Sequence, residues 1–294
     1  MVDFSGNQSP MPGAATCLMT KLLFPPAEWR LLITPPADGA TNMAIDEAVM
    51  HALADWRGQP TLRFYRWEPP CLSLGYNQHY TDVDTAACER LGYTWVRRPT
   101  GGRAILHTDE LTYSVITTQT DPRVDGGVVE SYRRLSAGLL AGLQQLGAVA
   151  VQAKGNMPKN PQQGAACFDT PSHYEVTLNG KKLVGSAQVR RKKMVLQHGT
   201  LPLRGDITRI FDVLAVSAAE KTDLARELLA RATTLAREMG RDVSFDEAAS
   251  AMAAGFAAVL NLRLTPAPLS AYEQELAAYY RTERYTTPAW NRRV

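Results

Sequence analysis

The sequence has few cysteines, and their spacing does not suit a metal. Only four of its 294 residues are cysteine: Cys17, Cys71, Cys88 and Cys167. They form no CxxC pair and no Cys/His cluster at metal-ligand spacing, so we expect no zinc or other metal site. In a reduced, cytoplasmic protein such thiols stay free for chemistry.

Long hydrophobic runs and a strong charge are also absent. No apolar run reaches the ~20 residues of a membrane-spanning helix. The first 28 residues are polar and rich in Pro and Gly, unlike a secretory signal. The net charge is only +3, whereas nucleic-acid binders usually carry a larger and clustered basic excess. We therefore expect a cytoplasmic protein that binds neither a membrane nor nucleic acid.

One basic run, Arg190-Arg191-Lys192-Lys193, lies between two strand-like segments. Its position predicts a solvated hairpin turn. The alternative left open by the sequence is that it docks an acidic partner protein.

The pattern of apolar residues predicts an α+β fold with mixed or antiparallel sheets flanked by helices. A polar stretch rich in Gly, Pro and Asn predicts a mobile loop over 153–166. Beyond residue 206 the pattern is helical, with no further strand expected. The predicted strands are 29–33, 61–67, 71–75, 93–97, 103–107, 111–118, 173–178, 182–190 and 195–203. The predicted helices are about 41–56, with Thr41 or Asn42 as N-cap, then 82–91, 128–146, 224–239, 245–260 and 269–280.

These patterns divide the chain into three parts. Residues 1–28 are expected to be a flexible leader, 29–215 a catalytic domain and 216–294 a helical C-terminal extension. We find no internal repeat, and we expect a monomer.

One candidate site is the segment RRPTGGRAILH, where two glycines follow paired arginines. Gly101 and Gly102 let backbone amides approach a ligand closely and tolerate positive φ. Arg97, Arg98 and Arg103 add positive charge beside them. A ligand with a phosphate or a carboxylate would suit this loop, and a plain turn with solvated arginines is the alternative. The loop contains no GxGxxG or GxxxxGK pattern.

A second candidate site is the segment ACFDTPSHYEVTLNGKKLVGSAQ. Cys167 follows the polar loop and precedes an Asp-Thr-Pro turn, and a loop cysteine near cations can be a nucleophile of low pKa. From the residues alone, an incidental cysteine remains the alternative. Lys182 lies in a predicted hairpin that returns toward this cysteine. The small-residue strand Gly185-Ser186-Ala187 would let a thin apolar group lie against the sheet.

Three histidines, His107, His173 and His198, are candidates for acid–base chemistry because each lies in or beside a predicted strand. A purely structural role remains open for each. Cys71 and Cys88 have the surroundings of core residues.

Both candidate segments resemble the signatures of the biotin/lipoate A/B protein ligase family. RRPTGGRAILH followed by ELTYSV is similar to the family's lipoate-binding loop. NGKKLVGSAQ, followed by LQHGTLPL, is similar to a second signature whose lysine is Lys182. Tyr76-Asn77-Gln78 and the early NMAIDE at 42–47 also fit. The resemblance covers residues 28–215 and implies the class II biotinyl/lipoyl ligase-like fold.

Within that family, ACFDTPSHYEV resembles the octanoyltransferases of Gram-positive bacteria (LipM type), in which the cysteine at this position accepts the acyl group. The resemblance implies that Cys167 attacks octanoyl-acyl-carrier protein and that Lys182 lowers the thiol pKa and stabilises the oxyanion. The acyl group then passes to a lysine of a lipoyl domain, in the glycine cleavage H protein or an E2 subunit. No cofactor is implied, since the carrier's phosphopantetheine is part of the substrate.

The resemblance also implies substrate-binding roles. The two loop glycines would wrap the octanoyl chain, Arg97 and Arg98 would face the carrier's phosphate or acidic surface, and His107 would line the pocket. The full substrate-binding set is Tyr76, Asn77, Arg97, Arg98, Thr100, Gly101, Gly102, Arg103, His107, Gly185, Ser186 and Ala187.

Three alternatives stay open. An ATP-dependent lipoate ligase would use Lys182 on the acyl phosphate, with Cys167 incidental. An amidotransferase would move octanoyl groups between lipoyl domains. A non-catalytic lipoyl-binding scaffold would have a degenerate site, which the intact Cys167 and Lys182 argue against.

Overall fold

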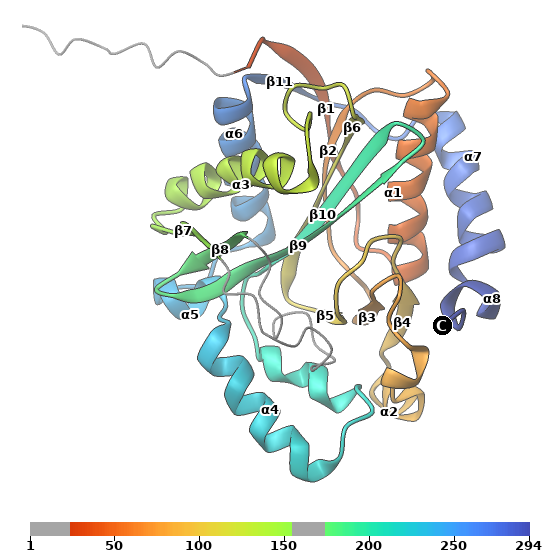
Figure 1. Cartoon of the computed structure of the whole chain (residues 1–294), viewed down its shortest axis with the longest axis vertical. Coiled ribbons are helices and arrows are strands. Elements are labelled where there is room, and N and C mark those ends of the chain that lie inside the picture. Colours follow the sequence, from red (N-terminus) through yellow and green to blue (C-terminus); the bar gives the residue numbers. More distant parts are fainter. Residues whose placement is uncertain (1–23, 155–173) are drawn as a thin grey trace, which may run out of the picture.

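A computed structural model describes residues 24–154 and 174–294. Its strands are β1 (Ala27–Ile33), β2 (Thr61–Tyr65), β3 (Cys71–Leu74), β4 (Thr94–Arg97), β5 (Ile105–His107), β6 (Glu110–Thr118), β7 (Val151–Lys154), β8 (Tyr174–Leu178), β9 (Lys181–Arg191), β10 (Met194–Pro202) and β11 (Leu262–Pro266). Within the described residues they form an eight-stranded sheet, β11-β1-β2-β6-β10-β9-β8-β7, and a three-stranded sheet, β4-β3-β5 (Figure 1). The mixed α+β class predicted from the sequence is confirmed.

Helices cover both faces of the large sheet. They are α1 (Gly39–Ala54), α2 (Thr85–Leu91), α3 (Val128–Gln145), α4 (Ala218–Arg231), α5 (Leu235–Met239), α6 (Phe245–Leu260), α7 (Ala271–Tyr280) and α8 (Pro288–Asn291), with short turns η1 (Tyr80–Asp82), η3 (Ile207–Asp212) and η4 (Arg281–Tyr285). Side chains alternate between the faces of a strand. Val195 of β10 accordingly packs with α3 and α6, and Leu196 packs with α1.

Helix α1 explains part of the site's construction. The side chain of Asp38 caps it by accepting a hydrogen bond from Thr41 N at 2.7 Å. The expected N-cap, Thr41 or Asn42, is therefore wrong. Asn42 is buried, and its amide donates to the carbonyls of Ala37 and Arg66. Asn42 thus satisfies two carbonyl groups inside the fold and does not cap the helix.

Glycines let α3 and α6 pack closely. A Cβ on Gly142 of α3 would lie 2.8 Å from the backbone of Met252. A Cβ on Gly255 of α6 would lie 2.2 Å from the Gly142 nitrogen. Any larger side chain at either position would force the helices apart.

The C-terminal part differs from expectation in two ways. The single helix predicted over 224–239 is two helices, because the chain breaks at 232–234, where Thr233 N donates to the carbonyl of Lys182. The expectation of no strand after residue 206 is wrong, since β11 pairs in parallel with β1. Strand β11 reads LRLTP, in which two leucines alternate with polar residues, but it is only five residues long and only Leu262 is buried. The region 216–294 therefore supplies an edge of the large sheet as well as helices.

Other segments fit the predictions or lie outside the described residues. The basic run forms the β9–β10 turn, with Lys192 and Lys193 at positive φ.

Strand β7 was not predicted. The predicted mobile loop from residue 155 onward and most of the predicted leader fall outside the described residues. Among the residues that are described, no helix combines the length and the apolar character that crossing a membrane requires.

Candidate active site

A pocket with an empty volume of about 350 Å³ lies between the large and the small sheet. Strands β9 and β10 form one wall, where Ala187 pairs with His198 and Gly185 with Thr200. Helix α1, β2, β3, β5, β6 and the loop after β4 supply the rest. The lining residues are Met43, Tyr65, Trp67, Ser73, Arg98, Ile105, His107, Thr112, Gly185, Ser186, Ala187, His198, Gly199 and Thr200.

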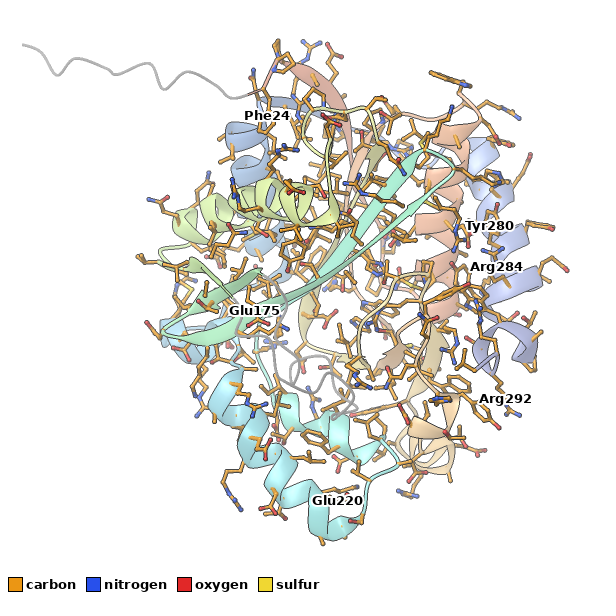
Figure 2. The ribbon with its side chains drawn as sticks, in the orientation of Figure 1. Phe24, Glu175, Glu220, Tyr280, Arg284 and Arg292 are labelled. Atoms are coloured by element: carbon orange, nitrogen blue, oxygen red, sulfur yellow. The ribbon has the colours of Figure 1, made fainter. Side chains whose placement is uncertain are left out.

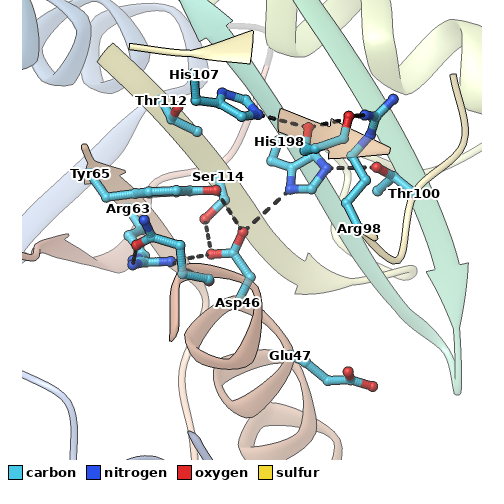
Figure 3. A network of polar contacts seen from close by, with 12 residues as sticks. Asp46, Glu47, Arg63, Tyr65, Arg98, Thr100, His107, Thr112, Ser114 and His198 are labelled. Atoms are coloured by element: carbon cyan, nitrogen blue, oxygen red, sulfur yellow. Dashed lines mark hydrogen bonds and ion pairs between the residues drawn. The ribbon is translucent and has the colours of Figure 1, made fainter. Parts of the chain in front are cut away.

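A buried ion pair stands behind this pocket (Figure 3). Asp46 of α1 and Arg63 of β2 are both fully buried and meet at 2.8 Å. Ser114 and Tyr65 donate hydrogen bonds to the same carboxylate. Burial raises the pKa of Asp46, but Arg63 and His198 together lower it by more, so the pKa lies below 3.8. The carboxylate is therefore ionised at neutral pH.

His198 connects this ion pair to the pocket and to the glycine loop. Its Nδ1 lies 3.4 Å from Asp46 Oδ2, and its Nε2 lies 2.6 Å from the hydroxyl of Thr100. Burial, with smaller contributions from Arg98 and His107, lowers the pKa of His198 by more than Asp46 raises it, so the pKa lies below its ordinary value. Because a carboxylate only accepts, the proton of the neutral ring lies on Nδ1 and Thr100 donates to Nε2.

His107 has the same arrangement on the opposite side of the pocket. Its Nδ1 lies 2.6 Å from Glu110 Oε1, and its Nε2 lies 2.8 Å from Ser73 Oγ. Its ring stacks on Trp67 with centroids 3.9 Å apart. The expected position of His107 in a pocket wall therefore agrees with the geometry. Two histidines, each oriented by a carboxylate, thus flank the cavity.

Arg98 is a buried residue of the pocket lining. It is 3% exposed, and it donates to the carbonyls of Ser73, Gly101 and Arg103. These hydrogen bonds hold the glycine loop in place, in which Gly102 has φ +94°. The oxygen of Gly102 would lie 1.8 Å from a Cβ on Gly75. The expectation that Arg98 faces a carrier's surface is wrong, because the side chain points into the fold.

Arg97 is also buried, at 0% exposure. Its guanidinium donates to the carbonyls of Gly75, Tyr76, Gln78 and Asn291. It fastens the loop after β3 to the C-terminal segment. The expected contact of Arg97 with a carrier's phosphate is therefore wrong as well.

The remaining loop residues predicted to bind substrate lie beside the pocket. Tyr76 N donates to the carbonyl of Thr100 at 2.8 Å, which ties the two loops together. Gly101 and Asn77 are exposed, and Arg103 is half-buried. None of these four is among the lining residues. Their predicted contact with substrate stays a prediction.

Lys182 is buried at the start of β9. Its ammonium lies 3.0 Å from Glu175 of β8, on the side of the molecule away from Tyr280 and Arg284 (Figure 2). Lys182 precedes the pocket-lining Gly185 by three residues, about 10 Å along a strand. Cys167 and His173 lie outside the described residues, so the predicted catalytic pair of Cys167 and Lys182 stays a prediction.

Sequence reasoning missed the ion pair of Asp46 and Arg63. Each residue interrupts an apolar stretch, in NMAIDEAVM and TLRFY respectively. Charged residues are almost never buried unless paired, but Asp46 stands beside Glu47 and Arg63 lies three residues before Arg66, so the local sequence did not show which of these charges would be buried. Within 24–154 and 174–294, no group of three or more His, Cys, Asp or Glu residues could hold a metal ion.

Comparison with known proteins identifies the family. The Lipoyl protein ligase A/B catalytic domain family matches residues 38–257. Octanoyltransferase LipM of Symbiobacterium thermophilum is 44% identical over 90% of this chain and 98% of its own length. The LipM of Kyrpidia tusciae is 45% identical, again over 90% and 98%.

A solved structure agrees with these relatives. It is the bi-partite lipoate protein ligase of Thermoplasma acidophilum, at 25% identity and a TM-score of 0.74, covering 90% of this chain and 96% of that one. The described strands, the pocket between two sheets and these matches lead to one assignment. The chain belongs to the lipoyl protein ligase A/B catalytic domain family.

Proposed function

We propose that this protein is an octanoyltransferase that attaches octanoyl groups to a lysine of a lipoyl domain. The observation that carries the proposal is the match with two proteins named octanoyltransferase, at 44% and 45% identity over 98% of their lengths. The octanoyltransferase predicted from the sequence agrees with these names.

The reaction has two acyl transfers. The Cys167 thiolate attacks the carbonyl of octanoyl-acyl-carrier protein, and the bond from that carbonyl to the phosphopantetheine sulfur breaks. The departing thiolate takes up a proton. The ε-amine of the acceptor lysine then attacks the acyl-enzyme, a C–N bond forms, and Cys167 leaves as thiolate while the amine loses a proton. Conversion of a thioester to an amide is downhill, so the reaction uses no nucleotide.

The pocket suits the octanoyl chain. Met43, Ile105 and Trp67 give it apolar walls, and Gly185 adds no side chain to the wall that β9 forms. Tyr113 contacts Ser186 at 2.8 Å and holds that strand from behind. Apolar walls with a small number of polar groups are typical of sites that bind small ligands.

Lys182 is proposed to assist Cys167. Glu175 holds its ammonium at 3.0 Å, and Thr233 N holds its carbonyl. An ammonium fixed in this way would favour a nearby thiolate and stabilise the oxyanion of each tetrahedral intermediate. The partners proposed are an acyl-carrier protein as donor and the glycine cleavage H protein or an E2 lipoyl domain as acceptor, in the cytoplasm and with the enzyme as a monomer.

Intact-protein mass spectrometry with peptide mapping tests the proposal. Mixing the protein with octanoyl-acyl-carrier protein, without ATP, should give an octanoyl adduct on Cys167 that passes to an apo lipoyl domain. Cys167→Ala should form no adduct, and Cys17→Ala is the matched control that should react normally. Lys182→Ala should slow the formation of the adduct.

The similarity to a lipoate protein ligase defines the competing result. Modification of the lipoyl domain that requires free octanoate or lipoate with ATP, and leaves Cys167 unacylated, would make the protein a ligase. That outcome would overturn the proposed transferase.

A further inference from the structure

A groove with a basic lining lies beside the active-site pocket. Its walls are α1, α7, η4 and the tip of the β9–β10 hairpin, and its empty volume is about 410 Å³. Arg191, Lys192 and Arg284 line it. The described lining contains one carboxylate, Glu47, which is 6% exposed and lies 3.6 Å from Arg191. Glu47 also pairs with Arg284, so the cations outnumber the anion.

The same surface continues over an aromatic platform. The guanidinium of Arg293 lies 4.0 Å from the ring centre of Tyr76 and 5.5 Å from that of Trp290. Arg284 lies 4.9 Å from the same Trp290 ring. We call Arg191, Lys192, Arg284 and Arg293 the basic cluster. Stacking on rings and pairing with Glu47 limit the motion of three of these side chains, which lowers the entropy cost of binding an anion.

The electrostatic effect of the cluster is visible at Tyr76. Arg293 lowers the pKa of its phenol most, and Arg191 and Arg284 add to the effect. The cations therefore act on one common region. About a third of the Arg191 and Arg284 side chains is exposed, at 34% and 31%, and Lys192 and Arg293 are exposed. The charge is accessible to a partner.

The basic cluster lies close to the pocket. Glu47 follows the pocket-lining Met43 by one turn of α1, about 6 Å along the axis. Arg191 follows the pocket-lining Ala187 by four residues of β9, about 13 Å. Tyr76 N contacts the carbonyl of Thr100, whose hydroxyl contacts the pocket wall at His198. An extended prosthetic arm anchored at the cluster could reach the pocket.

We propose that the basic cluster docks the donor carrier protein by holding its acidic surface and the phosphate of its prosthetic arm. This inference rests on the proposed octanoyl transfer from a carrier. Arginine forks bind phosphate oxygens in pairs, and lysine binds them as a point charge. The acceptor lysine brings no phosphate, so the donor is the better match. The cluster takes the role that the sequence suggested for Arg97 and Arg98, whose side chains are buried.

The test is a charge reversal at the two exposed members, Lys192→Glu with Arg293→Glu. We expect the KM for octanoyl-carrier protein to rise roughly tenfold or more, with kcat at saturation unchanged, because rim charges act mainly on association. The kinetics with the octanoyl thioester of N-acetylcysteamine, which has neither phosphate nor protein, should not change. The matched control is Arg226→Glu on α4, an exposed arginine away from the groove.

A binding measurement separates this inference from the proposed reaction. The holo-carrier protein, without an acyl group, should bind the wild type and lose roughly tenfold in affinity in the double variant. If the wild type transfers octanoyl groups and the double variant keeps its KM for the carrier, the docking site is wrong while the reaction stands. If the variant raises only the KM for the lipoyl domain, the cluster docks the acceptor and the inference fails. If the wild type binds the carrier through the cluster but transfers nothing, the docking site stands and the proposed reaction fails.

Discussion

Two sets of positively charged side chains in this protein differ in their burial. Arg63, Arg97 and Arg98 are buried and donate to carbonyls, side-chain oxygens or a carboxylate of the fold. The basic cluster keeps its charge at the surface, on the flank where Arg284 and Tyr280 lie together (Figure 2). The difference shows that a basic motif predicts a charged surface only where the fold leaves the side chain exposed.

The buried set is expected to determine stability and the exposed set recognition. A buried guanidinium without its partners leaves several polar groups unsatisfied, each of which costs free energy. Removing an exposed cation changes the free energy of unfolding little, since water replaces its contacts. The following substitutions test that division.

The largest effect is expected for Arg63→Met. It leaves the carboxylate of Asp46 buried without its cation, and breaking a buried pair in this way costs roughly 3–5 kcal/mol of unfolding free energy. Urea unfolding measures the loss. The double variant with Asp46→Leu should recover part of it, because no uncompensated charge remains. A double variant no more stable than Arg63→Met would contradict this account of the ion pair.

A smaller loss is expected for Arg97→Lys. The lysine keeps the charge but cannot reach all the carbonyls that the planar guanidinium binds, at an expected cost of roughly 2–3 kcal/mol. Thermal unfolding should show it, and hydrogen exchange should rise in the loop after β3 and in the C-terminal segment. Protection that stays at the wild-type level in both segments would show that Arg97 does not join them.

The pH dependence of stability should report on His198. Because its folded pKa lies below 6.5, the unfolded chain binds more protons as the pH falls below that value. The unfolding free energy should therefore decrease from about pH 6.5 downward and stop decreasing below the folded pKa. His198→Gln should show a smaller decrease between pH 7 and 5 when urea midpoints are compared. Parallel profiles would mean that His198 keeps its ordinary pKa.

The smallest effect on stability is expected for Lys192→Ser, in the exposed set. Its urea midpoint should equal that of the wild type, since the side chain is exposed at a hairpin tip. Its KM for the carrier should still rise, and added salt should change that KM less than in the wild type because one charge is gone. A clear loss of stability in Lys192→Ser would contradict the assignment of the exposed cations to recognition and of the buried ones to stability.

Much of the fold was predictable because its signals are local. Helix α6 begins and ends at the predicted residues 245 and 260, since its apolar pattern and its Ser244 cap stand next to each other in the chain. The β9–β10 hairpin follows from a run of basic residues between two apolar strands. Strand β11 was not predicted, because its pairing with β1 joins residues more than 230 positions apart and its own sequence, LRLTP, is too short to stand out beside helix α6.

The features of the candidate site also separate into those that local sequence predicts and those that depend on residues far apart in the chain. The sequence by itself indicated the family, the α+β class and the pocket-lining residues His107 and 185–187, because each lies in a short motif of recognisable composition. Arg98 also lines the pocket, but the sequence had suggested that it faces a carrier. The tertiary structure alone decided which charges are buried. Asp46, Arg63 and His198 come from α1, β2 and β10, and they meet only when the sheet forms. Burial depends on the elements that pack over a residue, which no local stretch of sequence records. Arg97 is therefore buried, whereas a third of the Arg191 side chain is exposed.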